Sequence, residues 1–168
     1  MDYRIIEKPA FDIIGRSRKF RTVNGENFIK IPQFWQEYMA TPEYKALMEL
    51  TGDKPGEVTG GGCLGICFGG ENTNWDPFSY GIGIEKPVKK SSSKFEVIPV
   101  PAASWAVFDC TLDNLQDITK RIFSEWFPST GYEHAPAPEL EVYLPEDPRT
   151  TVMKCQIWIP VFNKKKGK

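Results

Sequence analysis

The sequence predicts an α+β fold in which two similar halves share one antiparallel sheet with helices packed against it. Extended and helical segments follow one another in the order strand, helix, strand, strand, and the same order then repeats. Each half, about residues 1–94 and 95–168, is too small to bury a core of its own. We therefore expect a single domain over residues 1–168, in which the two halves pair into one sheet.

The first half contains one helical block between extended segments. The helix is expected over residues 31–50, because Pro32 suits a first helical turn and apolar residues recur at helical spacing. Thr41 is followed by proline, which indicates a cap and a restart within this block. Polar residues 22–27 precede it as a turn. The extended segments expected in this half are residues 3–20, with a bend at Pro9, residues 62–68 and residues 78–85.

The second half follows a polar connector, Lys89–Lys94, and repeats the pattern. Asp113 and Gln116 have the spacing of a capping box, which predicts that a helix starts there and ends at Pro128. Residues 129–137 are expected to form a loop. The extended segments expected in this half are residues 95–101, 103–111, 138–145 and 151–162.

Composition excludes several classes of function. The formal net charge is −1, so the basic surface that nucleic acid requires is not expected. One histidine and four scattered cysteines do not supply the ligand spacing of a metal centre, and we expect neither a metal nor a cofactor. No run is apolar and long enough to span a membrane, and the N-terminus lacks the features of a signal peptide. We expect a cytoplasmic protein with reduced thiols and no membrane partner.

A short strand between Pro138 and Pro145 carries an acidic residue in an apolar context. On a period of two, Glu139, Glu141 and Tyr143 share one face, and the aliphatic residues between them share the other. Two interpretations of Glu141 are open from the residues alone. It lies on a solvated outer face, or it points into an aromatic cavity, where a cationic or hydrogen-bonding ligand relieves the cost of burying a carboxylate.

Four stretches of the sequence are similar to one known family. They are Ala103-Ser-Trp-Ala-Val-Phe108, Glu125-Trp-Phe-Pro128, Leu140-Glu-Val-Tyr-Leu-Pro145 and Gln156-Ile-Trp-Ile-Pro-Val161. With these stretches the chain resembles the GyrI-like, AraC-type effector-binding domain, the small-molecule domain of multidrug-responsive transcription activators. The resemblance implies two β-α-β-β units in a pseudo-twofold arrangement with a central ligand cleft. We expect a stand-alone member, because no segment is left for the DNA-binding domain of the activators, and hence no direct nucleic-acid partner.

The resemblance also implies which residues contact the ligand. By position, Glu141 corresponds to the glutamate that drug-sensing members place at the bottom of an aromatic pocket, where it meets lipophilic cations. Trp105, which precedes the second helix, and Tyr143 are the next candidates to line this pocket. The other candidates, each of which also suits a position in the core, are Trp35, Tyr38, Phe68, Trp75, Tyr80 and Trp158.

These observations lead to a main expectation and two alternatives. We expect a binding module that captures an aromatic, cationic small molecule through its rings and through the charge of Glu141. The first alternative is a hydrolase that opens cyclopropane-bearing genotoxic natural products, with Glu141 as general base and Tyr143 or Tyr80 orienting or protonating the leaving oxygen. The second is a module that binds a separate regulatory protein, as gyrase-inhibiting members of the family do.

Overall fold

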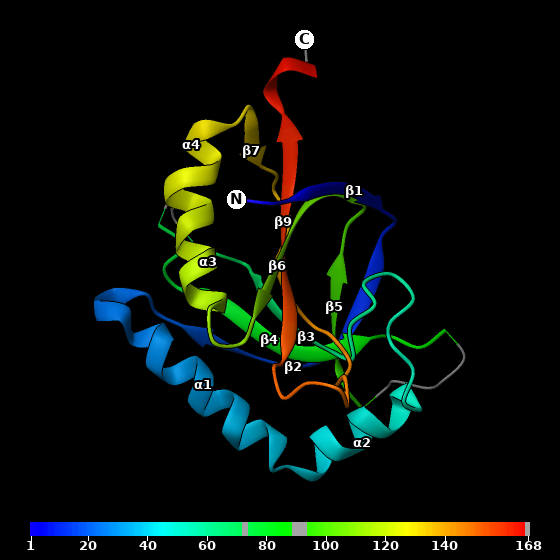
Figure 1. Cartoon of the computed structure of the whole chain (residues 1–168). Helices are drawn as coiled ribbons and strands as arrows, with labels where there is room; N and C mark the ends of the chain where they lie inside the picture. The colour runs from blue at the N-terminus through cyan, green and yellow to red at the C-terminus, as the bar shows by residue number, and fades with distance from the viewer. Residues whose placement is uncertain (72–73, 89–93, 167–168) are drawn as a thin grey trace.

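A computed structural model describes residues 1–71, 74–88 and 94–166 (Figure 1). The strands are β1 (Arg4–Lys8), β2 (Phe11–Phe20), β3 (Cys63–Phe68), β4 (Phe78–Glu85), β5 (Glu96–Val100), β6 (Ala103–Thr111), β7 (Tyr132–His134), β8 (Glu139–Tyr143) and β9 (Lys154–Asn163). The helical elements are η1 (Val23–Gly25), α1 (Glu26–Met39), α2 (Pro42–Thr51), α3 (Leu115–Arg121), the π-helical η2 (Ile122–Trp126), α4 (Phe127–Ser129) and η3 (Lys164–Lys166). The predicted α+β class is confirmed.

The described strands form a single antiparallel sheet whose order repeats outward from its centre. The order is β1-β6-β9-β8-β3-β4-β2-β5, and β7 adds to β9. From the central pair, the first half runs β3-β4-β2 and the second half runs β8-β9-β6, as a pseudo-twofold relation between the halves requires. Gly65 of β3 and Glu141 of β8 are opposite each other at the middle of this central pair.

The outermost strand of each half is exchanged between the halves. β1 precedes β2 in the chain but pairs with β6, so that Arg4 lies opposite Val107. β5 precedes β6 but pairs with β2, so that Val100 lies opposite Phe11. Each half therefore completes the sheet edge of the other. The predicted connector between the halves lies outside the described residues over 89–93.

Because of this exchange, we expect the chain to unfold in a single thermal transition. Neither half can melt without exposing the edge strand that it receives from the other. Differential scanning calorimetry should give equal calorimetric and van't Hoff enthalpies, and a protease cut within residues 89–93 should preserve the single transition. Two separate transitions, with one half still folded after the other has melted, would contradict this expectation.

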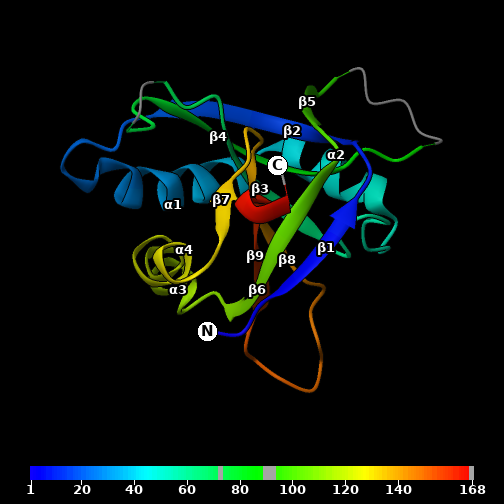
Figure 2. The ribbon, with the colours of Figure 1, turned by 90° about the horizontal axis from the view of Figure 1, so that it is seen from above.

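The helices cover one face of the sheet in two groups (Figures 1 and 2). α1 and α2 pack over β2, β3 and β4, and the helical run from α3 to α4 packs over β6 and β9. We call the first group of side chains the α1 cluster; its buried members are Ile14, Phe20, Phe34, Tyr38, Leu47, Cys63, Phe78, Tyr80, Ile82 and Ile84. We call the second the α3 cluster; its buried members are Ala106, Phe108, Cys110, Ile122, Trp126, Cys155, Ile157, Ile159 and Val161.

The opposite face of the sheet closes on itself. Its side chains form one further cluster, the inner core, which consists of Ile13, Leu64, Ile66, Ile98, Val100, Trp105, Val107, Leu140, Val142 and Trp158. β5 and β6 both contribute to the inner core although they lie far apart in the strand order. The sheet must therefore be strongly curved, as Figure 2 shows.

Three local features differ from the sequence-based expectation. α1 begins at Glu26, five residues before the predicted start, so Pro32 lies inside the helix and not in its first turn. The polar stretch before it did not distinguish a turn from the exposed start of a helix. Asp113 is not a cap, because α3 starts after Asn114, whose side chain accepts a hydrogen bond from the Thr111 amide. The predicted loop 129–137 contains β7, which is too short to show a periodicity.

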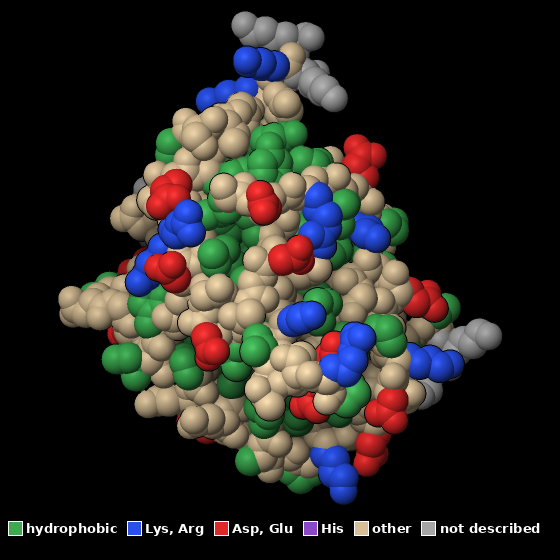
Figure 3. Space-filling view, in the orientation of Figure 1, with side chains coloured by type: hydrophobic (Ala, Val, Ile, Leu, Met, Phe, Trp, Pro, Cys, Tyr) green, Lys and Arg blue, Asp and Glu red, His purple; other side chains and the backbone are tan. Residues whose placement is uncertain are grey.

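The surface is mixed in charge. On the face shown in Figure 3, lysine and arginine side chains are interspersed with acidic ones. Several charged side chains of the protein form ion pairs across elements, among them Arg16 with Glu43 and Arg18 with Glu37. No helix within the described ranges is both long and apolar enough to cross a membrane.

Candidate functional site

Glu141 lies at the centre of the sheet, on the face that carries the helices. β8 is bordered by β3 and β9, so its backbone is paired on both sides. Side chains alternate along the strand, and Glu139, Glu141 and Tyr143 therefore point to the helical face, while Leu140 and Val142 enter the inner core. Tyr143 packs against both the α1 cluster and the α3 cluster, which places Glu141 between them.

The Glu141 carboxylate accepts two hydrogen bonds through one oxygen. Tyr143 Oη donates to Oε2 at 2.6 Å, and Tyr80 Oη donates to the same oxygen at 3.1 Å. Trp35 Nε1, which can only donate, donates to Tyr80 Oη at 2.9 Å. Tyr80 must therefore direct its own proton toward Glu141. The other oxygen, Oε1, accepts no hydrogen bond from any residue that the structure describes.

We call Trp35, Tyr80, Glu141 and Tyr143 the Glu141 cluster. Its members come from α1, β4 and β8, so they are distant in the sequence and are brought together by the sheet order. The rings of Trp35 and Tyr143 meet edge to face with centroids 5.2 Å apart. Trp35 and Tyr143 are partly buried, whereas Tyr80 is 1% exposed. The cluster thus has a buried floor and a partly accessible rim.

Gly65 makes room for this cluster, and sequence reasoning did not identify it. A Cβ atom at Gly65 would lie 2.3 Å from Tyr80 Oη and 3.3 Å from Glu141 Oε2. Any larger residue would therefore push the tyrosine away from the carboxylate. A glycine in the interior of a predicted strand is a known sign of close approach by another group, and this signal was present in the sequence.

Burial raises the pKa of Glu141, and the nearby charge of Glu139 adds to this rise. The hydrogen bonds from Tyr143 and Tyr80 act in the opposite direction, because they stabilise the ionised form. Among the described residues, no lysine, arginine or histidine forms an ion pair with Glu141. The site therefore holds an acceptor-rich carboxylate whose negative charge has hydrogen bonds but no counter-charge from the described residues.

Both tyrosines remain protonated donors at neutral pH. Burial raises the pKa of Tyr80 and of Tyr143, and the charge of Glu141 raises both further. Cys67, on the neighbouring strand β3, also has a raised pKa, first through burial and then through the charges of Glu141 and Glu139. Tyr80, Tyr143 and Cys67 are therefore neutral neighbours of Glu141.

The structure brings four of the predicted site residues together: Glu141, Tyr143, Tyr80 and Trp35. Trp75 lies at the edge of the same face, where its ring centroid is 5.9 Å from that of His134. Tyr38 is buried in the α1 cluster, and its ring packs on Phe34 and Tyr44.

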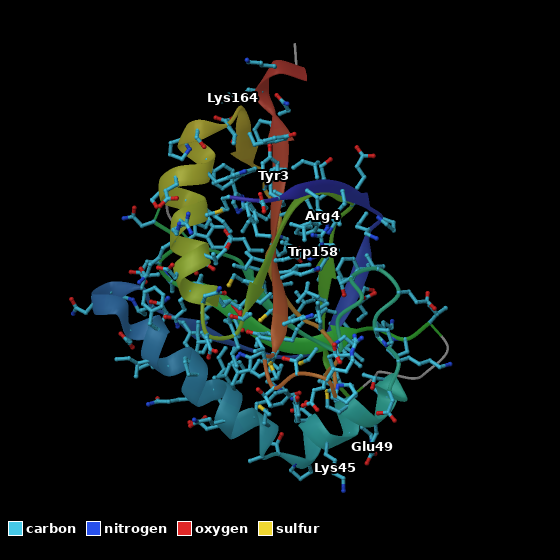
Figure 4. The ribbon with its side chains drawn as sticks, viewed as in Figure 1. Tyr3, Arg4, Lys45, Glu49, Trp158 and Lys164 are labelled. Carbon is cyan, nitrogen blue, oxygen red and sulfur yellow. The ribbon has the colours of Figure 1, made fainter. Side chains whose placement is uncertain are left out.

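The structure does not bring Phe68, Trp105 and Trp158 to Glu141. Trp105 and Trp158 belong to the inner core, on the opposite face of the sheet, and the partly buried Phe68 packs against it. Trp105 and Trp158 pack on each other with ring centroids 5.8 Å apart, and Trp158, labelled in Figure 4, lies opposite Leu140 in the strand register. Since alternate residues of a strand point to opposite faces, these rings cannot line a site over Glu141.

Comparison with known proteins places the chain in a family. A family model for integron-associated effector binding proteins matches residues 4–161. No functionally curated protein matches the sequence. Among solved structures, SAV2435 bound to tetraphenylphosphonium aligns with a TM-score of 0.76 and 19% identity, over 96% of this chain and 94% of that chain.

Two further structures share the architecture. An integron cassette protein from Vibrio cholerae aligns with a TM-score of 0.62 and 15% identity, over 95% of each chain. The C-terminal domain of EcmrR aligns with a TM-score of 0.55 and 16% identity, over 96% of this chain and 98% of that chain. At these identities, the alignments establish a common fold. The chain has the GyrI-like effector-binding fold and belongs to the family of integron-associated effector binding proteins.

Proposed function

We propose that this chain binds a lipophilic aromatic cation over the Glu141 cluster, where the family resemblance implies a ligand cleft. The observation that carries the proposal is the state of the Glu141 carboxylate. Two tyrosine hydroxyls hold it through Oε2, Oε1 accepts no hydrogen bond from the described residues, and no described cation neutralises it. An ionised carboxylate in this position is costly, and a bound cation offsets that cost.

The rings of the cluster suit the same class of ligand. Trp35 and Tyr143 are partly buried and meet edge to face beside the carboxylate. A cation in contact with such rings gains about 0.5–2 kcal/mol from each of them. The tetraphenylphosphonium bound to SAV2435 is a ligand of this kind, and that protein shares the fold over nearly the whole chain. Both points support a cation with aromatic substituents.

The proposed role in the cell is effector sensing. The matching family model describes effector binding proteins, which supports this role. We propose that a separate regulatory protein responds to the ligand-bound state of this chain.

Binding of a cation should depend on pH through Glu141. Because burial raises the pKa of Glu141, its ionised fraction falls at pH values above the usual range of a glutamate, about 4.3. We expect the affinity for tetraphenylphosphonium to decrease as the pH falls through this raised pKa. The affinity for a neutral ligand, triphenylphosphine oxide, should not decrease over the same range, because a protonated Glu141 can donate a hydrogen bond to its oxygen. Isothermal titration calorimetry between about pH 8 and pH 4 measures both. A cation affinity that is independent of pH would contradict the proposal.

Hydrolysis is the second candidate function at the same residue. It is favoured by the raised pKa of Glu141 and by Oε1, which accepts no hydrogen bond from the described residues and would take a proton from water. In that case a cyclopropane-bearing substrate should be turned over. Glu141→Gln should then lower the rate by about a hundredfold or more while substrate binding persists. If the wild type does not turn over this substrate and Glu141→Gln loses cation binding, the result supports the binding function instead.

A further inference from the structure

A second carboxylate lies on the same strand face and contacts the histidine of this chain. Glu139 is two residues from Glu141, a separation of about 7 Å along an extended strand. His134 Nε2 lies 2.9 Å from Glu139 Oε1, and His134 Nδ1 lies 2.6 Å from the Ala135 carbonyl oxygen. A carbonyl oxygen and an ionised carboxylate can only accept hydrogen bonds. Both ring nitrogens of His134 therefore face acceptors, a geometry that favours the doubly protonated imidazolium form of the ring.

Aromatic rings surround this imidazolium. Trp75 meets it edge to face with ring centroids 5.9 Å apart, and Phe123 stacks on it at 6.4 Å. Phe127 lies at 6.4 Å on the side of α4. Protonated His134 is an aromatic cation that contacts a carboxylate and is flanked by rings. We propose the same arrangement for a ligand at Glu141. His134 is thus a residue of the chain that is chemically similar to the proposed ligand.

The charge of Glu139 is the only one that faces His134 closely within the described residues. β8 presents Glu139, and the neighbouring strand β9 presents Val161. The three rings are Phe123 of η2, Phe127 of α4 and Trp75, which precedes β4. Glu133, the preceding residue of β7, is paired with Lys164. Among the charged groups, Glu139 therefore has the main influence on the protonation of His134, and it acts against the effect of burial.

We propose that Glu139 is a second cation subsite beside Glu141, and that His134 occupies it as an internal cation. This inference rests on the proposed function of Glu141. While His134 holds Glu139, the pair of carboxylates offers one uncompensated negative charge, and the site selects ligands with a single positive charge. When His134 is neutral or replaced, the two carboxylates suit an aromatic dication whose charges are about 7 Å apart.

The dependence on pH follows from the same contacts. Burial lowers the pKa of His134, but the hydrogen bond and charge of Glu139 and the Ala135 carbonyl outweigh it, so the pKa is raised. The internal cation is present below this raised pKa and is lost as the pH rises through it. The affinity of the wild type for a dication relative to a monocation should therefore increase with pH.

The test uses two flat two-ring cations of nearly equal size, methyl viologen with two charges and N-methylphenylpyridinium with one. The measured quantity is the ratio of their affinities at a pH where His134 is protonated. We expect His134→Gln, which keeps a hydrogen-bond donor for Glu139 but removes the charge, to raise the preference for methyl viologen by about tenfold. The double variant His134→Gln, Glu139→Gln should lose this gain. An unchanged ratio in His134→Gln would overturn the inference.

The single histidine of the chain provides a readout that needs no ligand. Its ring signals in NMR should titrate with a raised pKa in the wild type, and Glu139→Gln should lower that pKa. A pKa unaffected by Glu139→Gln would contradict the internal cation even if both probes bind. Binding of the monocation with an unchanged ratio contradicts the inference alone. If neither probe nor tetraphenylphosphonium binds the wild type, the proposed function fails, and the second subsite fails with it.

Discussion

Replacing Glu141 with glutamine is expected to weaken the binding of tetraphenylphosphonium by about 2–5 kcal/mol, roughly 30- to 5,000-fold. The substitution keeps the shape of the side chain, and the amide oxygen can still accept the hydrogen bonds of Tyr80 and Tyr143. What it removes is the negative charge, which no described residue neutralises. Calorimetric titration of the wild type and the variant measures the difference. The loss for neutral triphenylphosphine oxide should be much smaller.

The stability of the same variant provides its control. Folding raises the pKa of Glu141, so the folded protein favours the protonated side chain. At every pH above the ordinary glutamate range, the protein is therefore less stable with the ionised carboxylate than it would be with a protonated, neutral side chain. Glu141→Gln should therefore leave the melting temperature near pH 8 unchanged or raise it. A weaker affinity with an equal or higher melting temperature shows that the carboxylate serves binding. A lower melting temperature would instead indicate a structural role, and equal cation affinities would contradict the account.

Trp105→Ala is expected to lower the free energy of unfolding by about 3–5 kcal/mol. Trp105 is 0% exposed and packs on Trp158 in the inner core, where its removal leaves a large cavity. Its strand, β6, also joins the exchanged β1 to the sheet. Chemical denaturation measures the loss. Because the ring lies on the face opposite Glu141, the folded variant should bind tetraphenylphosphonium with the affinity of the wild type.

A matched control for this prediction is Trp35→Ala. Trp35 is partly buried and belongs to the Glu141 cluster, so its loss should cost less stability than the loss of Trp105 and should weaken cation binding. Comparison of the two variants thus distinguishes an effect on stability from an effect on cation binding. If Trp105→Ala weakened binding while the protein remained stable, the assignment of this ring to the inner core would be contradicted.

The sequence predicts the local part of the site because that part lies on one strand. Glu141 and Tyr143 are two residues apart, and the alternation of β8 is enough to place them on one face. Trp35 and Tyr80 were candidates only as aromatic residues among others. Their contact with Glu141 depends on the strand order and on the position of α1, which no local pattern contains.

The same limit explains why the sequence did not separate the candidate rings beside Glu141 from those on the opposite face of the sheet. Residues 105–108 of β6 are all buried, and so are residues 157–161 of β9. A strand that is covered on both faces shows no alternation of apolar and polar residues, so its sequence does not reveal which side chains share a face. The pairing register of β6 with β9, and of β9 with β8, determines the face on which Trp105 and Trp158 lie.

The exchange of edge strands was hidden for a related reason. β1 and β5 were predicted as extended segments, but a strand pattern does not identify the pairing partner. His134 was likewise expected in a loop, because β7 has only three residues. The side chain of His134 contacts Glu139 of β8 directly, because β7 and β8 both pair with β9. Pairings between distant segments therefore decide what the candidate site contains.

The most direct test of the account is a crystal structure of the protein with bound tetraphenylphosphonium. The account predicts that the phosphonium lies over the Glu141 cluster, with its charged centre nearest to Oε1 of Glu141. Its phenyl rings should contact Trp35 and Tyr143, while Tyr80 and Tyr143 still donate to Oε2. A cation bound elsewhere on the molecule, with the Glu141 carboxylate out of contact with it, would contradict the central claim.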